Sequence, residues 1–219
     1  LYCLVGGEGS TAVAFDAKTG KVKWKSLNAE NQGYSPPSII QAGGTDQLII
    51  WHTKSINGLN PSTGDLYWAL PLKPNYGMAV ITPQLSGNKM FASGIGRIGA
   101  LIELGKDQPT AKFAWKGKPK TALYSCNSTP IIVDGVIYGS DISSNCLVAA
   151  NLEDGKRFWQ TEEPVVEKEH RTSGRHGTVY LTHHAGNEQF WIVNEGGNLI
   201  LAKLNKEGYK ELGRQHILE

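Results

Sequence analysis

The chain has 219 residues, 40% of them hydrophobic, and includes 26 glycines and six tryptophans, which is enough apolar material for a sizeable core with many turns. Its formal net charge is only +2, and the Lys and Arg residues are scattered along the sequence. This argues against nucleic acid as a partner, because phosphate binding needs a dense basic face. No apolar run is long enough to cross a bilayer, and no signal peptide is visible.

A tryptophan recurs at a nearly constant interval along the chain. The intervals are 44, 47 and 44 residues between Trp24, Trp68, Trp115 and Trp159. In three of these four copies a glycine stands four residues before the tryptophan, namely Gly20, Gly64 and Gly155. Such a period indicates an array of structural repeats, in which these tryptophans and glycines are structural anchors.

The segment around each of these glycines predicts a β-hairpin. Residues 15–24, 59–68 and 150–159 each hold an Asp or Asn, then the glycine, then a strand that ends in the tryptophan. The Asp or Asn can accept a backbone hydrogen bond, and the glycine can adopt positive φ, as in a hairpin built on a type I turn with a left-handed residue. The third copy has a longer loop instead, over 104–109.

A second hairpin precedes each of these. Residues 130–133 and 136–139 are β-branched runs on either side of Asp134-Gly135, which is a strong hairpin signal. The corresponding runs in two other copies are 37–40 with 48–51, and 82–85 with 89–92. A fifth, less regular copy covers 178–212, with Leu212 in the place of the tryptophan.

Each repeat therefore has four short antiparallel strands. A repeat of about 40 to 45 residues with four strands is typical of a propeller blade. The sequence predicts an all-β fold, a β-propeller of four-stranded antiparallel blades. The expected blades cover approximately 1–27, 33–71, 76–117, 124–161 and 174–213.

Several short sequence motifs resemble those of a known family. Residues 16–24 spell Asp-x-x-Thr-Gly-x-x-x-Trp, and Ser35-Pro36 and Thr129-Pro130 open first strands. These motifs are similar to the sequence repeat of quinoprotein-type β-propellers. That repeat occurs in pyrroloquinoline-quinone (PQQ) alcohol dehydrogenases and in the outer-membrane assembly lipoprotein of the same fold. Residues 197–204 and 208–209 resemble, more narrowly, uncharacterised propellers abundant in planctomycete-type bacteria.

The resemblance implies a ring of seven or eight blades and an extracytoplasmic location, in the periplasm or cell envelope. The chain begins at Leu1 on what aligns with a second strand, and 215–219 resembles the start of another blade. We therefore expect 1–219 to be one propeller domain truncated at both ends. The alternative is a small ring that these blades close alone. An incomplete ring would leave exposed edges that favour edge pairing or oligomers.

Dehydrogenases of the resembled family carry two adjacent cysteines whose disulfide lies on PQQ, a tryptophan beneath the cofactor, and a Glu/Asn/Asp set around calcium. Here Cys3, Cys126 and Cys146 are never adjacent. That constellation is not carried over, so we expect neither PQQ nor calcium. We expect ordinary thiols, because Cys126 and Cys146 stand near the starts of different strands and a disulfide needs a short Cα separation.

Two further patterns favour structural interpretations. Residues 94–99 match the dinucleotide-binding pattern GxGxxG, but glycine and proline at 105 and 109 break any following helix, so we expect a blade loop between second and third strands. His170, His176, His183 and His184 lie within fifteen residues, yet they lack the spacing of converging zinc ligands. We expect solvated or hydrogen-bonded histidines and no metal site.

The loops that lead into the first strand of each blade lie at one mouth of a propeller's channel, where ligands bind. By repeat alignment the candidate binding residues in these loops are Tyr34, Ser35, Tyr76, Tyr124, Ser125, Asn127, Arg175 and His176. The tyrosines recur in three successive blades and can stack a planar ligand or a sugar, while Arg175 suits an anion. Alternatively, the tyrosines plug the interfaces between blades.

We expect a binding or interaction scaffold without catalysis of its own, whose ligand is a protein, a small molecule or a carbohydrate. No Ser/His/Asp arrangement at the spacing of a nucleophile elbow appears. One alternative is a PQQ-dependent oxidoreductase, which needs a polar calcium-binding funnel above a stacking tryptophan. The other is an envelope protein-assembly factor like the outer-membrane lipoprotein, which needs a large apolar or acidic rim patch for its protein partners.

Overall fold

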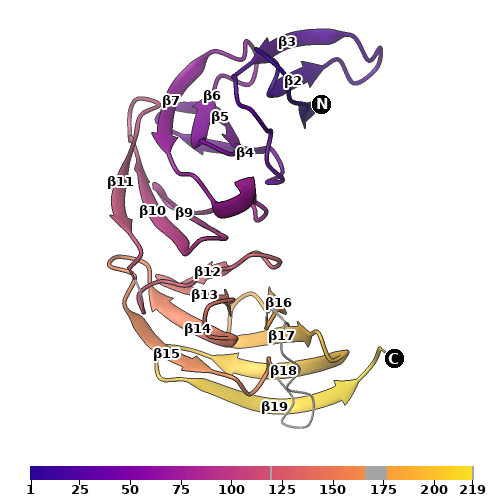
Figure 1. The fold of residues 1–219 in the computed structure, drawn as a ribbon. Coiled ribbons are helices and arrows are strands. Elements are labelled where there is room, and N and C mark those ends of the chain that lie inside the picture. The colour runs from indigo at the N-terminus through magenta and orange to yellow at the C-terminus, as the bar shows by residue number, and fades with distance from the viewer. Residues whose placement is uncertain (119, 166–176, 219) are drawn as a thin grey trace. The chain divides into compact units, whose positions relative to one another are not determined.

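A computed structural model describes residues 1–118, 120–165 and 177–218. Over these residues the regular structure is almost entirely β-strand, with one short 3-10 helix, η1 (Asn75–Gly77). The chain divides into two compact units, Leu1–Lys116 (unit 1) and Gly117–Glu219 (unit 2). Figure 1 shows their strands, which form three antiparallel sheets in unit 1 and two in unit 2. The predicted all-β fold of antiparallel sheets is confirmed.

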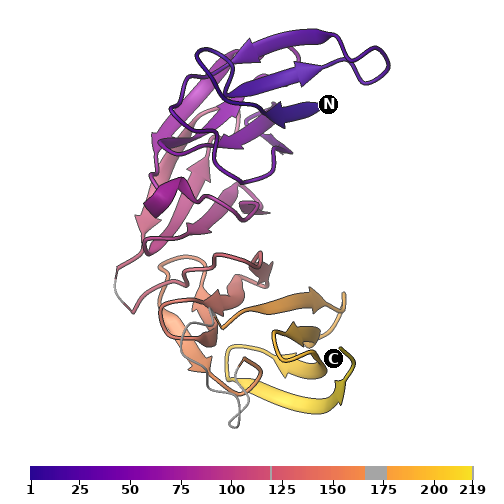
Figure 2. The same cartoon turned by 45° about the vertical axis from the view of Figure 1, so that its right-hand side comes forward.

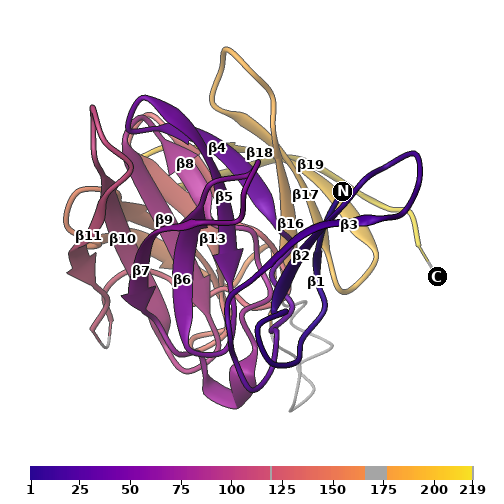
Figure 3. The ribbon, with the colours of Figure 1, turned by 90° about the horizontal axis from the view of Figure 1, so that it is seen from above.

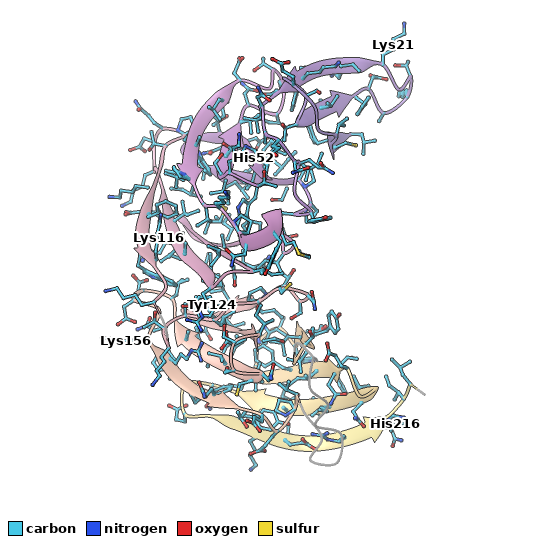
Figure 4. All side chains as sticks on the ribbon, in the orientation of Figure 1. Lys21, His52, Lys116, Tyr124, Lys156 and His216 are labelled. Atoms are coloured by element: carbon cyan, nitrogen blue, oxygen red, sulfur yellow. The ribbon has the colours of Figure 1, made fainter. Side chains whose placement is uncertain are left out.

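Unit 1 holds the first three sheets, whose strands lie side by side in chain order. The first sheet consists, within the described residues, of β1 (Tyr2–Leu4), β2 (Ala12–Phe15) and β3 (Val22–Ser26). The second consists of β4 (Ser38–Ala42), β5 (Thr45–Trp51), β6 (Ser55–Leu59) and β7 (Leu66–Pro71). The third consists of β8 (Gln84–Ser86), β9 (Lys89–Gly94), β10 (Ile98–Leu104) and β11 (Ala111–Lys116). The β2–β3 turn projects from the unit (Figure 2), and Lys21 lies in this turn (Figure 4).

Unit 2 repeats this arrangement twice. The fourth sheet consists of β12 (Ile131–Val133), β13 (Val136–Asp141), β14 (Cys146–Asn151) and β15 (Arg157–Thr161). The fifth consists of β16 (Val179–His183), β17 (Gln189–Asn194), β18 (Asn198–Leu204) and β19 (Tyr209–His216). The Asp134-Gly135 turn between β12 and β13 has φ of 49° and 73°, the left-handed pair that a two-residue hairpin requires. The residues 94–99 form the end of β9, the turn and the start of β10, without a helix.

The turns β2–β3, β6–β7 and β14–β15 share one geometry. The backbone at Gly20, Gly64 and Gly155 is left-handed, with φ of 70°, 81° and 71°. The N–H of each glycine donates to the carbonyl of the Asp or Asn four residues earlier, at 2.9, 2.8 and 2.8 Å. The side-chain oxygen of the same Asp or Asn accepts a hydrogen bond from the N–H two residues on. The predicted turn chemistry is confirmed.

The four repeat tryptophans occupy one register position. Each follows a β-bulge, and their partners on the preceding strand are Ala14, Gly58, Leu101 and Ala149. In the fifth sheet we expected Leu212 in this place, but the bulge puts Gly213 opposite Leu201 instead. Leu212 is 42% exposed. The expectation was wrong by one position because the β18–β19 turn is shorter, with the Asn205 N–H bonded to the Gly208 carbonyl at 3.2 Å.

Two of the repeat tryptophans contact the turn of the next sheet. Trp24 Nε1 donates to the carbonyl of Pro61 at 3.1 Å, and Trp159 Nε1 donates to the carbonyl of Asn205 at 2.7 Å. A Cβ added to Gly64 would lie 2.6 Å from Trp24 Cε3, so the indole packs directly on that glycine. Trp24 and Trp159 therefore fix neighbouring sheets to each other, whereas Trp68 Nε1 donates to Gln47 Oε1 of its own sheet at 2.6 Å.

The second sheet packs through both faces, because successive side chains on a strand point to opposite sides. We call the face toward the preceding sheet the upstream face, and the face toward the following sheet the downstream face. On β5, Leu48 and Ile50 join the core shared with the first sheet, and Ile49 and Trp51 join the core shared with the third. Figure 3 shows β5 beside β6 in this second sheet.

The same alternation holds in unit 2. Tyr138 and Ala149 on the downstream face of the fourth sheet share a core with Phe190 and Ile192 on the upstream face of the fifth. Burying one large apolar side chain contributes about 1.5–3 kcal/mol, so these shared cores account for much of the stability of each sheet pair.

Candidate functional site

In unit 1, the loops that lead into first strands lie beside the turns between second and third strands. Thr53 Oγ1 donates to the carbonyl of Asn31 at 2.9 Å, and the Asn75 N–H donates to the carbonyl of Ile95 at 2.9 Å. The loops 27–37 and 72–83 thus form one surface with the turns 52–54 and 95–97, which we call the lead-in face of unit 1.

Tyr34 and Ser35 connect the two loops of this face. The Tyr34 N–H donates to the carbonyl of Ala79 at 3.0 Å, and Ser35 Oγ donates to the carbonyl of Ile81 at 2.8 Å. Ser35 is buried, whereas the Tyr34 side chain is 66% exposed. The backbone of the loop is therefore fixed, and the ring of Tyr34 points to solvent.

Tyr76 is the most exposed large hydrophobic residue of the described chain, at 88%. Its φ of 57° is left-handed, which costs a non-glycine residue roughly 1–3 kcal/mol. Gly77 follows with φ of 67°, and a Cβ added there would lie 2.7 Å from Thr53 Cγ2. Tight packing beneath the loop thus holds Tyr76 outward in a strained conformation, which is a feature typical of functional sites.

A buried polar cluster supports this face. His52, buried and labelled in Figure 4, accepts a hydrogen bond at Nδ1 from the Lys54 N–H at 3.2 Å. Its Nε2 therefore carries the proton and donates to Ser55 Oγ at 3.2 Å, which donates in turn to Asn57 Oδ1 at 3.0 Å. In this arrangement the hydroxyl donates away from the imidazole, so His52 and Ser55 do not form a base and nucleophile pair.

Unit 2 places its candidates differently. Tyr124 (Figure 4) is buried, and its hydroxyl donates to the carbonyl of Lys118 at 2.6 Å. Ser125 is also buried and donates to the carbonyl of Ser140 at 2.7 Å. Tyr124 thus occupies the interior, unlike Tyr34 and Tyr76 in unit 1.

Of the remaining candidates of unit 2, the structure describes only Asn127. Asn127 is exposed, and its Oδ1 accepts a hydrogen bond from Cys126 Sγ at 3.1 Å. Arg175 and His176 lie outside the described residues.

Asp141, at the end of β13, is a buried residue that sequence reasoning missed. Its Oδ1 accepts the Tyr124 N–H at 3.0 Å, and its Oδ2 pairs with Arg157 Nη2 at 2.9 Å. Arg157 Nε also donates to the carbonyl of Ala122 at 2.7 Å. This ion pair thereby fixes the loop 120–130 to the end of β13 and the start of β15. The only sign of Asp141 in the sequence is a charged residue at the end of an apolar strand.

The structure offers no metal centre among the residues it describes, where no group of three or more His, Cys, Asp or Glu side chains converges. His183 Nε2 lies 2.7 Å from the carbonyl of Asn187, and His184 Nδ1 lies 2.7 Å from Asn187 Nδ2. Both rings are thus hydrogen-bonded to one turn, as expected, while His170 and His176 lie outside the described residues. Across the described ranges, no helix has the length and hydropathy of a membrane span.

All three cysteines are free thiols. Burial raises the pKa of Cys126 and of Cys146 above the ordinary thiol value. The prediction of unpaired cysteines is confirmed.

Comparisons with known proteins give one consistent family. The family model that matches residues 2–161 is described as the outer membrane protein assembly factor BamB. The BamB of Yersinia pestis is 25% identical to this chain, over 74% of the chain and 41% of that protein. The crystal structure of BamB from Moraxella catarrhalis aligns with a TM-score of 0.65 at 15% identity, and covers 98% of this chain and 58% of that one.

Other propellers are similar in fold alone. The β-propeller domain of Cps50 (Swd1) from Myceliophteria thermophila aligns with a TM-score of 0.59 at 9% identity, over 96% of this chain and 66% of that one.

The chain spans less than two thirds of the length of both BamB relatives. The narrower resemblance to planctomycete propellers stays a prediction. The predicted propeller with quinoprotein-like repeats is confirmed, and because the family model covers most of the chain, this protein belongs to the family of the outer membrane protein assembly factor BamB.

Proposed function

We propose that this protein is a protein-binding scaffold of the cell envelope that takes part in outer-membrane protein assembly. Its family supports this proposal, since the matched model and the Yersinia relative are both named as outer membrane assembly factors. Of the functions that the sequence left open, the envelope assembly factor thus has the best support. A scaffold of this kind needs no cofactor.

The observation that carries the proposal is the pair of exposed tyrosines on the lead-in face of unit 1. Tyr34 and Tyr76 project from loops that are fixed by backbone hydrogen bonds. Tyrosine is enriched in binding hot spots, because its large amphipathic ring loses little conformational entropy on binding. A fixed loop lowers the ordering cost of binding further. We therefore place the protein-binding site on this face.

A photo-crosslinking experiment tests the site. A photoreactive phenylalanine analogue is placed at position 34, at position 76 or at position 158, and the proteins crosslinked in intact cells are identified by mass spectrometry. Phe158 is the matched control, an aromatic that is 40% exposed on the fourth strand of the fourth sheet. We expect positions 34 and 76 to capture the same envelope protein and position 158 not to capture it.

The affinity for the captured protein then measures the contribution of each ring. Tyr76→Ala removes the ring and leaves a Cβ in the same left-handed backbone, so the fold is kept while binding weakens by about tenfold or more. Equal capture from all three positions, or unchanged affinity of both Tyr34→Ala and Tyr76→Ala, contradicts the assignment of the site. Bound quinone absorbance in the purified protein would instead favour the oxidoreductase.

A further inference from the structure

The lead-in face of unit 1 carries an excess of positive charge. Its segments hold three cationic residues, Lys54, Lys73 and Arg97, against one acidic residue, Glu30. The formal net charge of the whole chain is +2, so this face accounts for all of it and the remaining charged residues balance. The three cationic residues are exposed, and within the described residues none of their side chains has an ion-pair partner.

Two of these cations belong to segments that are bonded to each other. The Leu72 N–H donates to the carbonyl of Lys54 at 3.2 Å, so the backbone of Lys54 is fixed to the residue before Lys73. Lys73 in turn lies three residues before Tyr76 on the same loop. Neither the loop 72–83 nor the turn that carries Lys54 contains an acidic residue. The positive charge beside the exposed ring is therefore not neutralised within these segments.

The third cation, Arg97, lies on a turn that packs against the Tyr76 loop. A Cβ added to Gly96 would lie 2.5 Å from Asn75 Cγ, so the turn rests on the residue before Tyr76. Arg97 has a left-handed φ of 59°, close to the 57° of Tyr76. Two exposed residues on adjoining turns are thus both held in a conformation that is unfavourable for a side chain. Arg and Tyr are also the residue types that are enriched in binding hot spots.

This combination of charge and aromatic surface fits a partner that bears carboxylates. A guanidinium binds a carboxylate through parallel hydrogen bonds, and flanking ammonium groups attract further carboxylates as point charges. Complementary charge also raises the rate at which partners meet, and it disfavours partners of the wrong sign. The ring of Tyr76 supplies the apolar contact that charge alone does not.

We propose that the lead-in face of unit 1 binds an acidic segment of its protein partner, rich in aspartate or glutamate, with one carboxylate on Arg97 and the segment lying against Tyr76. The proposal rests on the proposed function for the claim that this face binds a protein, and it adds the chemistry of the bound segment. A protein segment fits better than an anionic lipid surface. Glu30 on the same face repels a uniformly negative surface, whereas a segment can place its carboxylates away from it.

Fluorescence anisotropy of a labelled peptide tests the proposal on the purified 219-residue chain. The probe is a short synthetic peptide of alternating aspartate and serine around one central phenylalanine, and the control peptide has asparagine in place of every aspartate. We expect the acidic peptide to bind about tenfold more tightly than the control peptide at low salt. This difference decreases as the salt concentration rises from about 0.05 to about 0.5 M, because exposed charges are screened.

Substitutions assign the binding to this face. Arg97→Gly removes the guanidinium and suits the left-handed backbone, so the chain stays folded while its affinity for the acidic peptide falls by about tenfold. Lys54→Gln combined with Lys73→Gln lowers the affinity in the same direction. The matched control is Lys18→Gln combined with Lys21→Gln, which makes the same change of net charge at exposed residues of the β2–β3 turn, outside the lead-in face. We expect this control to keep the wild-type affinity.

The proposal is overturned if the two peptides bind alike, if the acidic peptide does not bind, or if Arg97→Gly binds it as the wild type does. Binding to phosphatidylglycerol vesicles, in the absence of binding to the acidic peptide, also overturns it and indicates a lipid surface. The photo-crosslinking result is separate. Capture of one protein from positions 34 and 76, at a segment without aspartate or glutamate, keeps the proposed function and overturns the acidic segment. Binding of the acidic peptide without such capture contradicts the proposed function and keeps the recognition of acidic segments.

Discussion

His52 shows how one buried side chain makes unit 1 sensitive to pH. Burial lowers the pKa of His52 below its ordinary value, and the nearby charge of Lys54 lowers it further. The unfolded chain therefore binds a proton at this histidine more readily than the folded chain does. The stability that His52 contributes is complete above the unfolded pKa of about 6.5 and is lost as the pH falls below that value.

We expect the free energy of unfolding of the wild-type chain to decrease between about pH 7.5 and about pH 5.5. His52→Gln keeps an acceptor for the Lys54 N–H but does not titrate, so its decrease over this range is smaller. Urea denaturation of both chains at each pH measures the difference. If the free energy of unfolding falls equally with pH in the wild type and in His52→Gln, the pH dependence does not come from His52.

At the scale of single elements, two turns with the same backbone conformation differ in the side chains that pack on them. Gly20 and Gly64 have the same left-handed backbone, but an added Cβ meets nothing within 4 Å at Gly20 and meets Trp24 at Gly64. Gly20→Ala therefore costs only the conformational strain of about 1–2 kcal/mol. Gly64→Ala adds the displacement of the indole, for a total of roughly 3 kcal/mol or more.

Urea unfolding of the two glycine variants measures these costs, and the emission spectrum reports whether the indole environment has changed. Gly20→Ala is the matched control, since it changes the same turn geometry without a neighbour. If both substitutions destabilise the chain equally and leave the emission spectrum unchanged, the packing of Trp24 does not depend on Gly64.

The elements that the sequence predicted well are those specified by local chemistry. Asp134-Gly135 has one favourable turn conformation, and the spacing of Gly20 and Trp24 sets the hairpin length, so both were predictable. The identity of the residue after a bulge depends on pairing with a neighbouring strand. For this reason Gly213, and not Leu212, takes the tryptophan position, and sequence spacing alone did not show it.

The candidate site was less predictable for a similar reason. Repeat alignment treats Tyr76 and Tyr124 as equivalent, because both precede a first strand. Exposure, however, depends on tertiary partners: Thr53 packs beneath the loop of Tyr76, while Asp141 and the Lys118 carbonyl hold Tyr124 inside unit 2. Asp141 is 17 residues from Tyr124 and Lys118 is six, and none of these partners belongs to a recognisable motif.

At the scale of the whole molecule, the three cysteines report on folding of the described chain. Cys126 and Cys146 are buried, and their raised pKa further lowers the thiolate fraction at neutral pH, whereas Cys3 is partly exposed. Because the thiolate is the reactive form, we expect one fast-reacting thiol in the native chain and three in denaturant, as counted with a chromogenic disulfide reagent. Cys3→Ser removes the fast phase and leaves the two slow thiols. Fast reaction of two or more thiols in the native wild-type chain would show that unit 2 opens readily, and that its hydrogen-bonded loop 120–130 is not held closed by Asp141 and Arg157.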